Sequence, residues 1–432
     1  MKKTLILIIL LASIVQLETN AQLKHDMSSN YTSYKGLVMC GYQGWFRAPG
    51  DGSGSEWGHY GRDGKFDKDH NTVDFWPDVS GYKKVYETEF IGHDGKPAKV
   101  FSSLDQSTTD LHFSWMKEYG IDGVFMQRFF RVARDNNPEK SADIILSNAL
   151  DASIKYGRAI SVMYDLSGLN PEGEDCSAVI EDWKYLVDEM KVTSRGEDQN
   201  YLFHNGKPLV VIWGLGFTTR PYDIRKIGVN RLIDFLKNDP VYGGCSVMLG
   251  TPTYFRTLNN DTRPDPYLHE LIRSADIVLP WMVQRFTPLL HHERDRYRDH
   301  VMEDIAWCRE QGVDYVPIVY AGFSWQNLSL TRPGFVRASA YGAIPRHGGR
   351  FYWDLIHAAI TAGAEMLYVA MFDEIDEGTA IIPVLDNPPE SEDYHFVDND
   401  GMPGDHYLWL TGKAGQVLRR EIPNTPDIPQ RK

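Results

Sequence analysis

Cysteine is scarce in this sequence, and the spacing of the few cysteines excludes two common frameworks. The 432 residues include four of them, Cys40, Cys176, Cys245 and Cys308, with no CxxC pair. Four cysteines in so long a chain do not make a disulfide scaffold, and no Cys/His spacing typical of zinc occurs. We predict a protein that uses neither a metal nor an organic cofactor.

Positive charge is also in short supply. Lys and Arg number 45 against 59 Asp and Glu, a net charge of −14, which argues against nucleic acid or an anionic membrane surface as a partner. Aromatic residues, in contrast, make up 12% of the chain. Many aromatic rings with modest charge suit a neutral, polar, flat ligand, and sugars are the obvious class of that kind.

Several catalytic and cofactor motifs are missing. The sequence contains no G-x-S-x-G and no H-E-x-x-H, which leaves a peptidase or esterase with little support. No glycine-rich phosphate loop follows the first expected strand, so binding of a dinucleotide is disfavoured as well.

Long hydrophobic runs are confined to the N-terminus. A basic start, Met1 to Lys3, precedes an apolar run from Thr4 to Val15, and Thr19 and Ala21 stand at −3 and −1 of a cut before Gln22. This pattern predicts a cleaved signal peptide over residues 1–21 and an exported protein, secreted or periplasmic. A buried N-terminal helix fits less well, because the run has no amphipathic face. No second run approaches about 18 residues, so we expect no membrane span.

The rest of the chain, residues 22–432, indicates one domain. Its apolar runs are nearly continuous instead of alternating, which is typical of strands buried on both faces. Eight strands alternating with helices favour a single (β/α)8 barrel over an open doubly wound sheet. The expected strands are Leu37–Phe46, Gly123–Phe130, Ala159–Gly168, Pro208–Phe217, Cys245–Phe255, Asp276–Val283, Tyr315–Trp325 and Glu365–Glu374. The expected helices are Ser107–Tyr119, Glu139–Tyr156, Ser177–Met190, Ile224–Lys237, Glu293–Gln311 and Gly349–Thr361.

Two long segments lie outside this alternation. Residues 47–106 form a long first βα loop rich in Gly, Asp and aromatics, which we expect to be ordered and to lie on the active face. The tail from Pro383 to Lys432 reads as loop.

Catalytic groups of such barrels lie at the C-terminal ends of the strands. The C-terminal ends of the expected strands carry aromatic rings with amide, guanidinium and carboxylate groups between them. This combination binds sugar rings. Trp45, Trp281 and Trp325 are the expected stacking platforms, although some of these aromatics could simply pack the top of the barrel. The predicted substrate-binding residues are Tyr42, Gln43, Trp45, Gln127, Tyr164, Asp165, Trp213, Tyr254, Arg256, Trp281 and Trp325.

The last expected strand ends in a cluster of acids. Residues 373–377 contain four acids in five positions, directly after the apolar run Met366–Phe372. In a dry cleft they would repel one another, which raises at least one pKa and places a neutral acid beside an ionised base. Glu374 and Glu377 are at most about 10 Å apart along the chain, compatible with a glycosidase carboxylate pair. A solvated acidic turn is the alternative.

Four segments together resemble the glycoside hydrolase family 71/99-like proteins, over nearly the whole mature chain. They are Cys40-Gly41-Tyr42-Gln43-Gly44-Trp45-Phe46, Gly322-Phe323-Ser324-Trp325, the run from Ile344 to Phe351, and Phe372-Asp373-Glu374-Ile375-Asp376-Glu377-Gly378-Thr379. The resemblance to family 99, the endo-α-mannosidases, implies a (β/α)8 barrel. Family 71, the α-1,3-glucanases, is the other relative.

The resemblance also implies residue roles. Glu374 and Glu377 match the two catalytic glutamates of a Glu-Trp-His-Glu-Gly context, with Glu377 as general acid. Glu374 would be the base that deprotonates the sugar 2-hydroxyl, which then attacks C1 and forms a 1,2-anhydro intermediate. This sequence has Ile375 and Asp376 in place of Trp and His, so Asp376 would raise the pKa of the acid or bind another sugar hydroxyl.

These observations leave three hypotheses. The leading one is a retaining glycoside hydrolase acting on an α-linked, most readily α-mannoside-like, oligosaccharide or glycan. The second is an inverting α-glucanase that uses two of the same acids with a water between them. The third is a carbohydrate-binding protein that has lost turnover, since fold alone does not confer function.

Overall fold

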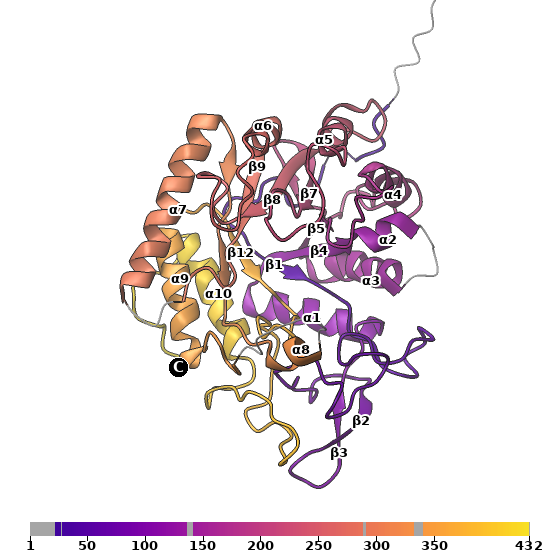
Figure 1. Cartoon of the computed structure of the whole chain (residues 1–432), viewed down its shortest axis with the longest axis vertical. Coiled ribbons are helices and arrows are strands. Elements are labelled where there is room, and N and C mark those ends of the chain that lie inside the picture. The colour runs from indigo at the N-terminus through magenta and orange to yellow at the C-terminus, as the bar shows by residue number, and fades with distance from the viewer. Residues whose placement is uncertain (1–21, 27, 136–140, 288–290, 332–339, 432) are drawn as a thin grey trace, which may run out of the picture.

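The computed structural model describes residues 22–26, 28–135, 141–287, 291–331 and 340–431. The expected signal peptide, residues 1–21, lies outside the described residues, as do residues 139 and 140 of the helix expected over Glu139–Tyr156. Figure 1 shows strands at the centre of the molecule with helices around them.

A closed ring of parallel strands forms the centre. Each strand pairs in parallel with the next, and the last, β12, pairs with the first, β1. The seventh position is shared by two short strands, because β10 pairs with β9 and β11 pairs with β12. The strands are β1 (Val38–Tyr42), β4 (Gly123–Phe129), β5 (Ala159–Asp165), β7 (Lys207–Trp213), β8 (Ser246–Pro252), β9 (Ile277–Trp281), β10 (Asp314–Tyr315), β11 (Ile318–Tyr320) and β12 (Leu367–Ala370). The predicted (β/α)8 barrel is confirmed.

Every residue of β1, β5, β8 and β12 is buried, as their continuous apolar sequences predicted. Side chains in register point to the same side of the sheet, so Met163, Val211, Met248 and Ile277 form one layer inside the barrel. In the next layer Gly250 leaves room for an indole, since a Cβ there would lie 2.1 Å from Cδ1 of Trp213.

Helices cover the outside of the ring and agree with the predicted helices, with ends shifted by a few residues. Four further helices of the described residues, α2, α6, α8 and α10, were not expected. The helices are α1 (Gln106–Tyr119), α2 (Phe130–Asp135), α3 (Ser141–Tyr156), α4 (Ser177–Asp188), α5 (Val229–Asn238), α6 (Tyr267–Ser274), α7 (His291–Gln311), α8 (Gln326–Thr331), α9 (Arg350–Thr361), preceded by the 3-10 turn η1 (His347–Gly349), and α10 (His406–Leu418). Within the part of the chain that is described, no helix has the length and apolarity needed to cross a membrane.

The tail is not all loop, which corrects the sequence-based expectation. Its helix α10 carries two glycines that obscure the helical pattern, and one of them has a packing reason. A Cβ on Gly412 would lie 1.8 Å from the carbonyl oxygen of Tyr119, at the end of α1. Glycine therefore lets α10 pack directly against the backbone of α1.

The long first βα loop is ordered, as expected, and it contains an antiparallel hairpin of β2 (Tyr86–Ile91) and β3 (Pro97–Val100). The hairpin protrudes from the lower edge of the molecule in Figure 1. Outside this loop, the two-residue strand β6 (Phe203–His204) pairs antiparallel with β7. The end of the first loop lies beside its own start, because the N–H of Ser103 donates to the carbonyl oxygen of Phe46 at 2.9 Å.

Candidate active site

The alternation of side chains along each strand decides which residues face the interior of the barrel. Nε2 of Gln127 in β4 lies 3.2 Å from the hydroxyl of Tyr368 in β12 and 3.0 Å from the sulfur of Met163 in β5. Strands β4 and β12 are not neighbours, so Gln127 reaches across the interior. The next residue, Arg128, points the other way and donates to Asp182 of α4 at 2.6 Å.

Two predicted substrate-binding tyrosines also point outward, contrary to expectation. The hydroxyl of Tyr42 lies 2.8 Å from Nδ1 of His112 in α1. The hydroxyl of Tyr164 donates to Asp182 at 2.8 Å. Both rings are buried between the strands and the helices. The reason is the period of two along a strand, which turns each of them away from its inward-facing neighbour, Gln43 or Asp165.

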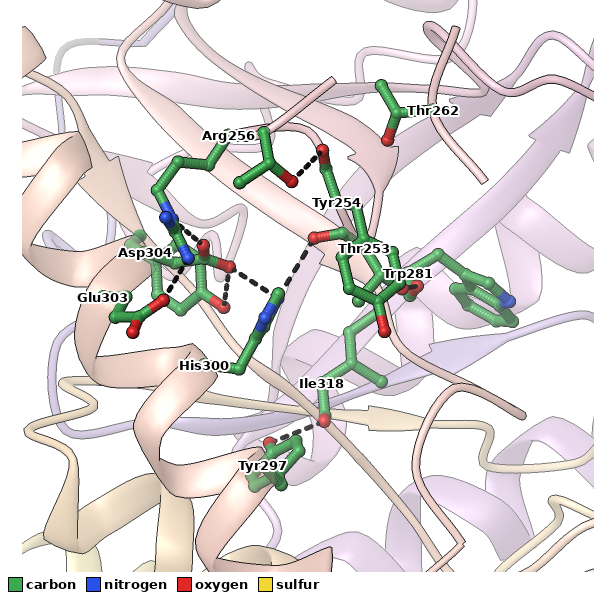
Figure 2. Close-up of polar contacts among 12 residues, drawn as sticks. Thr253, Tyr254, Arg256, Thr262, Trp281, Tyr297, His300, Glu303, Asp304 and Ile318 are labelled. Atoms are coloured by element: carbon green, nitrogen blue, oxygen red, sulfur yellow. Dashed lines mark hydrogen bonds and ion pairs between the residues drawn. The ribbon is translucent and has the colours of Figure 1, made fainter. Parts of the chain in front are cut away.

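Arg256 does not face the mouth of the barrel either. Figure 2 shows its guanidinium directed at α7, where Nε donates to the buried carboxylate of Asp304 at 2.9 Å and Nη2 donates to Glu303 at 2.5 Å. Asp304 also lies 3.1 Å from Nε2 of His300, whose ring meets that of Tyr254 edge-on at 5.4 Å. Arg256 thus ties the loop after β8 to the helix layer.

At the mouth itself, Asp373 joins the ends of the first and last strands. Its two carboxylate oxygens accept the N–H groups of Gln43 and Gly44, each at 2.8 Å. The side chain is fully buried, and this burial raises the pKa of Asp373 to about 7 against the opposing effect of the two N–H donors. The charge of Asp376 adds to the increase.

Glu374 follows directly and is held by two donors. Nε2 of Gln43 donates to its Oε1 at 2.8 Å, and the hydroxyl of Thr379 donates to its Oε2 at 2.7 Å. Only 4% of Glu374 is exposed. Burial is the main reason that the pKa of Glu374 is raised, and the charges of Glu377 and Asp376 raise it further. The carboxylate is therefore more basic than an ordinary glutamate once ionised, and its two donors stabilise the ionised form.

Glu377 lies at the end of a tight turn and is partly exposed. Its carbonyl oxygen accepts the N–H of Ser324 at 3.0 Å. The next residue, Gly378, has a φ of +66°, and a Cβ there would lie 2.7 Å from the nitrogen of Ser324. The turn that carries the second glutamate therefore requires glycine and packs against the loop after β11.

Asp376 is the third acid of the cluster. It is 3% exposed, and its Oδ1 has no hydrogen-bond partner within the described residues. Its Oδ2 lies 3.5 Å from Nδ1 of His59, in the long first loop. The ring of His59 stacks on Trp45 at a centroid distance of 3.9 Å and an interplanar angle of 6°. Trp45 also stacks on Phe129, at 5.5 Å and 20°, so protein rings already contact the indole that was expected to serve as a sugar platform.

A cavity of about 630 Å³ opens beside the cluster. Gln43, Trp45, His59 and Gln127 line it together with residues of α2 and α3. It adjoins the acids through Gln43, whose side chain donates to Glu374. A space of this size, with a few polar groups on an apolar wall, is typical of sites for small organic ligands.

The opposite wall of the mouth is aromatic. Trp213 and Trp281 meet edge to face with centroids 5.4 Å apart, and the guanidinium of Arg220 lies 5.2 Å from the centre of the Trp213 ring. Asp165 is in register with Trp213 and faces the same way. Burial raises the pKa of Asp165, and a hydrogen bond from the N–H of Ser167 at 2.7 Å opposes the increase.

Trp325 is partly exposed in the loop after β11, with its ring 5.5 Å from that of Phe323. All three expected platforms, Trp45, Trp281 and Trp325, are partly exposed. His59, Thr379 and Arg220 are further residues of the site that were not predicted from the sequence. Thr379 could have been found from its place in the acid-rich motif, whereas no local pattern distinguishes His59 or Arg220.

The described residues contain no group of three or more His, Cys, Asp or Glu side chains that could hold a metal ion. The four cysteines are buried and unpaired.

No protein-family model matches the sequence, and no curated protein matches it either. Among solved structures, the chain is similar to a GH99 endo-α-mannosidase from Bacteroides thetaiotaomicron, with 18% identity and a TM-score of 0.61 over 90% of this chain and 99% of that one. A second GH99 endo-α-mannosidase structure from that bacterium, in complex with bis-tris-propane, has 17% identity and a TM-score of 0.59, over 90% of this chain and 99% of that one. The likeness shows a common fold, so the resemblance to family 99 is confirmed at the level of the barrel.

Proposed function

We propose that the protein is a glycoside hydrolase that cleaves an α-linked oligosaccharide or glycan, with α-mannosides as the favoured substrates. The observation that carries the proposal is the acid cluster at the end of β12, where buried Glu374 and partly exposed Glu377 stand at the mouth of the barrel beside a cavity of about 630 Å³. The shared fold with a GH99 endo-α-mannosidase supports the same class.

In the proposed mechanism Glu374 is the base and Glu377 the acid. Glu374 takes the proton of the sugar 2-hydroxyl, and O2 attacks C1 while Glu377 protonates the departing glycosidic oxygen. The product of this step is a 1,2-anhydro sugar. Water then opens it at C1, giving its proton to Glu377 while Glu374 returns a proton to O2. Two inversions at C1 give net retention, and both carboxyl groups end as they began.

The environment of Glu374 supports its role as base. Abstraction of a hydroxyl proton needs a carboxylate that is more basic than usual but still ionised. Burial and the neighbouring Glu377 raise the pKa of Glu374, while Gln43 and Thr379 donate to both oxygens. Once ionised, the carboxylate is more basic than an ordinary glutamate, and the two donors oppose the increase in its pKa.

The mechanism also favours the mannose configuration. Attack of O2 on C1 requires O2 and the departing oxygen to lie on opposite faces of the ring. An α-mannoside meets this requirement, whereas an α-glucoside has both oxygens on one face. Ile375, in place of the Trp of the family 99 motif, is fully buried and offers no platform to a sugar ring, so the contacts around the sugar differ from that motif.

We further propose that residues 1–21 are a signal peptide and that the exported domain, residues 22–432, works outside the cytoplasm. A polymeric glycan substrate agrees with that location. Edman sequencing of protein purified from its native host should begin at Gln22 and would contradict the proposal if it began at Met1.

The test of the proposed function is a sugar-release screen of residues 22–432 against α-mannan, N-glycan and α-glucan substrates, with the products identified by mass. We expect release from an α-mannoside, and Glu377→Gln should lower the rate by about 10²- to 10⁴-fold, as expected for loss of a general acid. Binding of the sugar to Glu377→Gln should persist in calorimetry. Unchanged turnover in Glu377→Gln would remove Glu377 from the mechanism. Sugar binding without hydrolysis by wild type would favour a carbohydrate-binding protein instead.

A further inference from the structure

We propose that His59 is a positioning residue of the acid cluster: stacked on Trp45, its imidazole pairs with Asp376 and holds that carboxylate in place beside Glu374 and Glu377. The pairing itself does not depend on the reaction. Its consequence for turnover rests on the proposed function.

The backbone of His59 is held in an unfavourable conformation. Its φ is +59°, in the left-handed region, where a side chain costs about 1–2 kcal/mol. Two hydrogen bonds fix the chain there. The hydroxyl of Thr72 donates to the carbonyl oxygen of His59 at 2.8 Å. The N–H of Arg47 donates to the carbonyl oxygen of Gly58 at 2.9 Å. Glycine would adopt this conformation at little cost, so the imidazole needs another reason for its place.

The stack on Trp45 directs the imidazole. The two rings are nearly parallel, 3.9 Å apart, and Phe129 of β4 supports the indole from a second side. A ring fixed in this way has few alternative rotamers. Its Nδ1 stands 3.5 Å from Oδ2 of Asp376, an ion-pair distance when the imidazole is protonated.

Asp376 needs such a partner. It is 3% exposed, and its other oxygen has no hydrogen-bond partner within the described residues. A buried carboxylate in this situation is costly unless a donor or counter-charge lies close by. The long first loop supplies His59, whose Nδ1 lies 3.5 Å from Oδ2 of this carboxylate.

The position of Asp376 matters because its charge acts on its neighbours. Asp376 contributes to the raised pKa values of both Asp373 and Glu374. The pair also borders the cavity of about 630 Å³, because the side chain of His59 is 45% exposed and lines it. Displacement of Asp376 would therefore alter the base and the sugar contacts together.

The first test measures the pair without any substrate. Unfolding free energies of wild type, His59→Asn, Asp376→Asn and the double variant form a double-mutant cycle. Asn is chosen because it tolerates the left-handed conformation, so His59→Asn removes the imidazole without adding backbone strain. We expect the loss caused by His59→Asn to be clearly smaller in the Asp376→Asn background. Additive losses would overturn the pairing.

The second test uses turnover of whichever glycan the wild type cleaves. His59→Gly should lower kcat by roughly 3- to 10-fold and by no more than Asp376→Asn does, because His59 acts only through the carboxylate that it positions. Added imidazole should restore part of this loss, because glycine leaves the site of the ring empty. The double variant His59→Gly/Asp376→Asn should not respond to imidazole, because the partner is gone.

The control is His70→Gly, which removes another histidine of the same loop that pairs with an aspartate, Asp67, at 2.7 Å. We expect this variant to keep wild-type kcat. Full activity of His59→Gly, or equal imidazole rescue with and without Asp376, would overturn the positioning role. If the wild type cleaves no glycan, the proposed function fails, and the double-mutant cycle still decides the pairing.

Discussion

Asp373 serves the fold and the acid cluster through one carboxylate. It accepts the N–H groups of Gln43 and Gly44 and thereby closes the barrel mouth between β1 and β12. The same contact fixes the backbone of Gln43, whose side chain donates to Glu374. The base of the proposed mechanism is therefore positioned, through Gln43, by a second acid that is fully buried.

The raised pKa of Asp373 predicts how stability depends on pH. Its pKa is about 7 in the folded protein and about 3.9 in an unfolded chain. Between these values the folded state retains a proton that the unfolded state has lost, so the free energy of unfolding falls as the pH rises from about 4 to about 7. Glu374, whose pKa is also raised, contributes in the same direction.

Asp373→Asn should flatten this decline, because the amide does not titrate. Urea unfolding at several pH values between about 4 and about 7 measures the slope for wild type and variant. Asp94→Asn, which removes an exposed acid between β2 and β3, is the control and should retain the wild-type slope. A slope that is equally steep in Asp373→Asn would show that Asp373 does not retain its proton on folding.

Asp376→Asn should move the acidic limb of the pH–rate profile more than it lowers the maximum. The proposed base, Glu374, must be ionised to act, and the charge of Asp376 is one cause of its raised pKa. Removal of that charge lowers the pKa of Glu374, so the limb should move to lower pH. Initial rates across the pH range provide the measurement. Loss of activity at every pH would indicate that Asp376 is itself catalytic.

Among the elements, the turn after β12 is held from outside the barrel by a buried arginine. Nη2 of Arg346 donates to the carbonyl oxygens of Gly378 and Ala380 at 3.0 and 2.8 Å. Its guanidinium lies between the rings of Phe75 and Tyr407, 4.1 and 4.7 Å from their centres. The long first loop and α10 therefore both support the turn that carries the two glutamates.

The packing of α10 on α1 predicts opposite results for two glycines of one helix. Gly412→Ala should lower the free energy of unfolding by about 1–3 kcal/mol, since a Cβ there meets the backbone of Tyr119 and forces the helices apart. At Gly415 a Cβ would lie 3.1 Å from the flexible end of Arg419. Gly415→Ala should be neutral or stabilising, because alanine favours helix by about 1 kcal/mol. Denaturant unfolding distinguishes the two, and equal effects would contradict the close packing.

At the scale of the whole molecule, the barrel could be predicted because burial on both faces leaves continuous apolar runs in the sequence. The helices between them followed from their amphipathic pattern. The acid cluster could also be located, since Asp373 to Glu377 directly follow the last strand. Helix α10 was missed because Gly412 and Gly415 conceal a helix whose glycines serve packing.

The orientation of individual side chains was harder to predict. Tyr164 and Asp165 are adjacent in β5, so only one of them can face inward, and the sequence alone did not identify which. His59 reaches Asp376 across 317 positions of the chain. Its place depends on the path of a long loop that no local pattern determines.

The configuration of the first sugar released decides whether the 2-hydroxyl takes part in the reaction. Proton NMR during hydrolysis of an α-mannan oligosaccharide by residues 22–432 would record which anomer appears before mutarotation. Participation of the 2-hydroxyl predicts the α-anomer from wild type and no measurable release from Glu377→Gln over the same interval. Initial formation of the β-anomer would contradict it, because one inversion at C1 excludes participation of the 2-hydroxyl and favours direct attack by water.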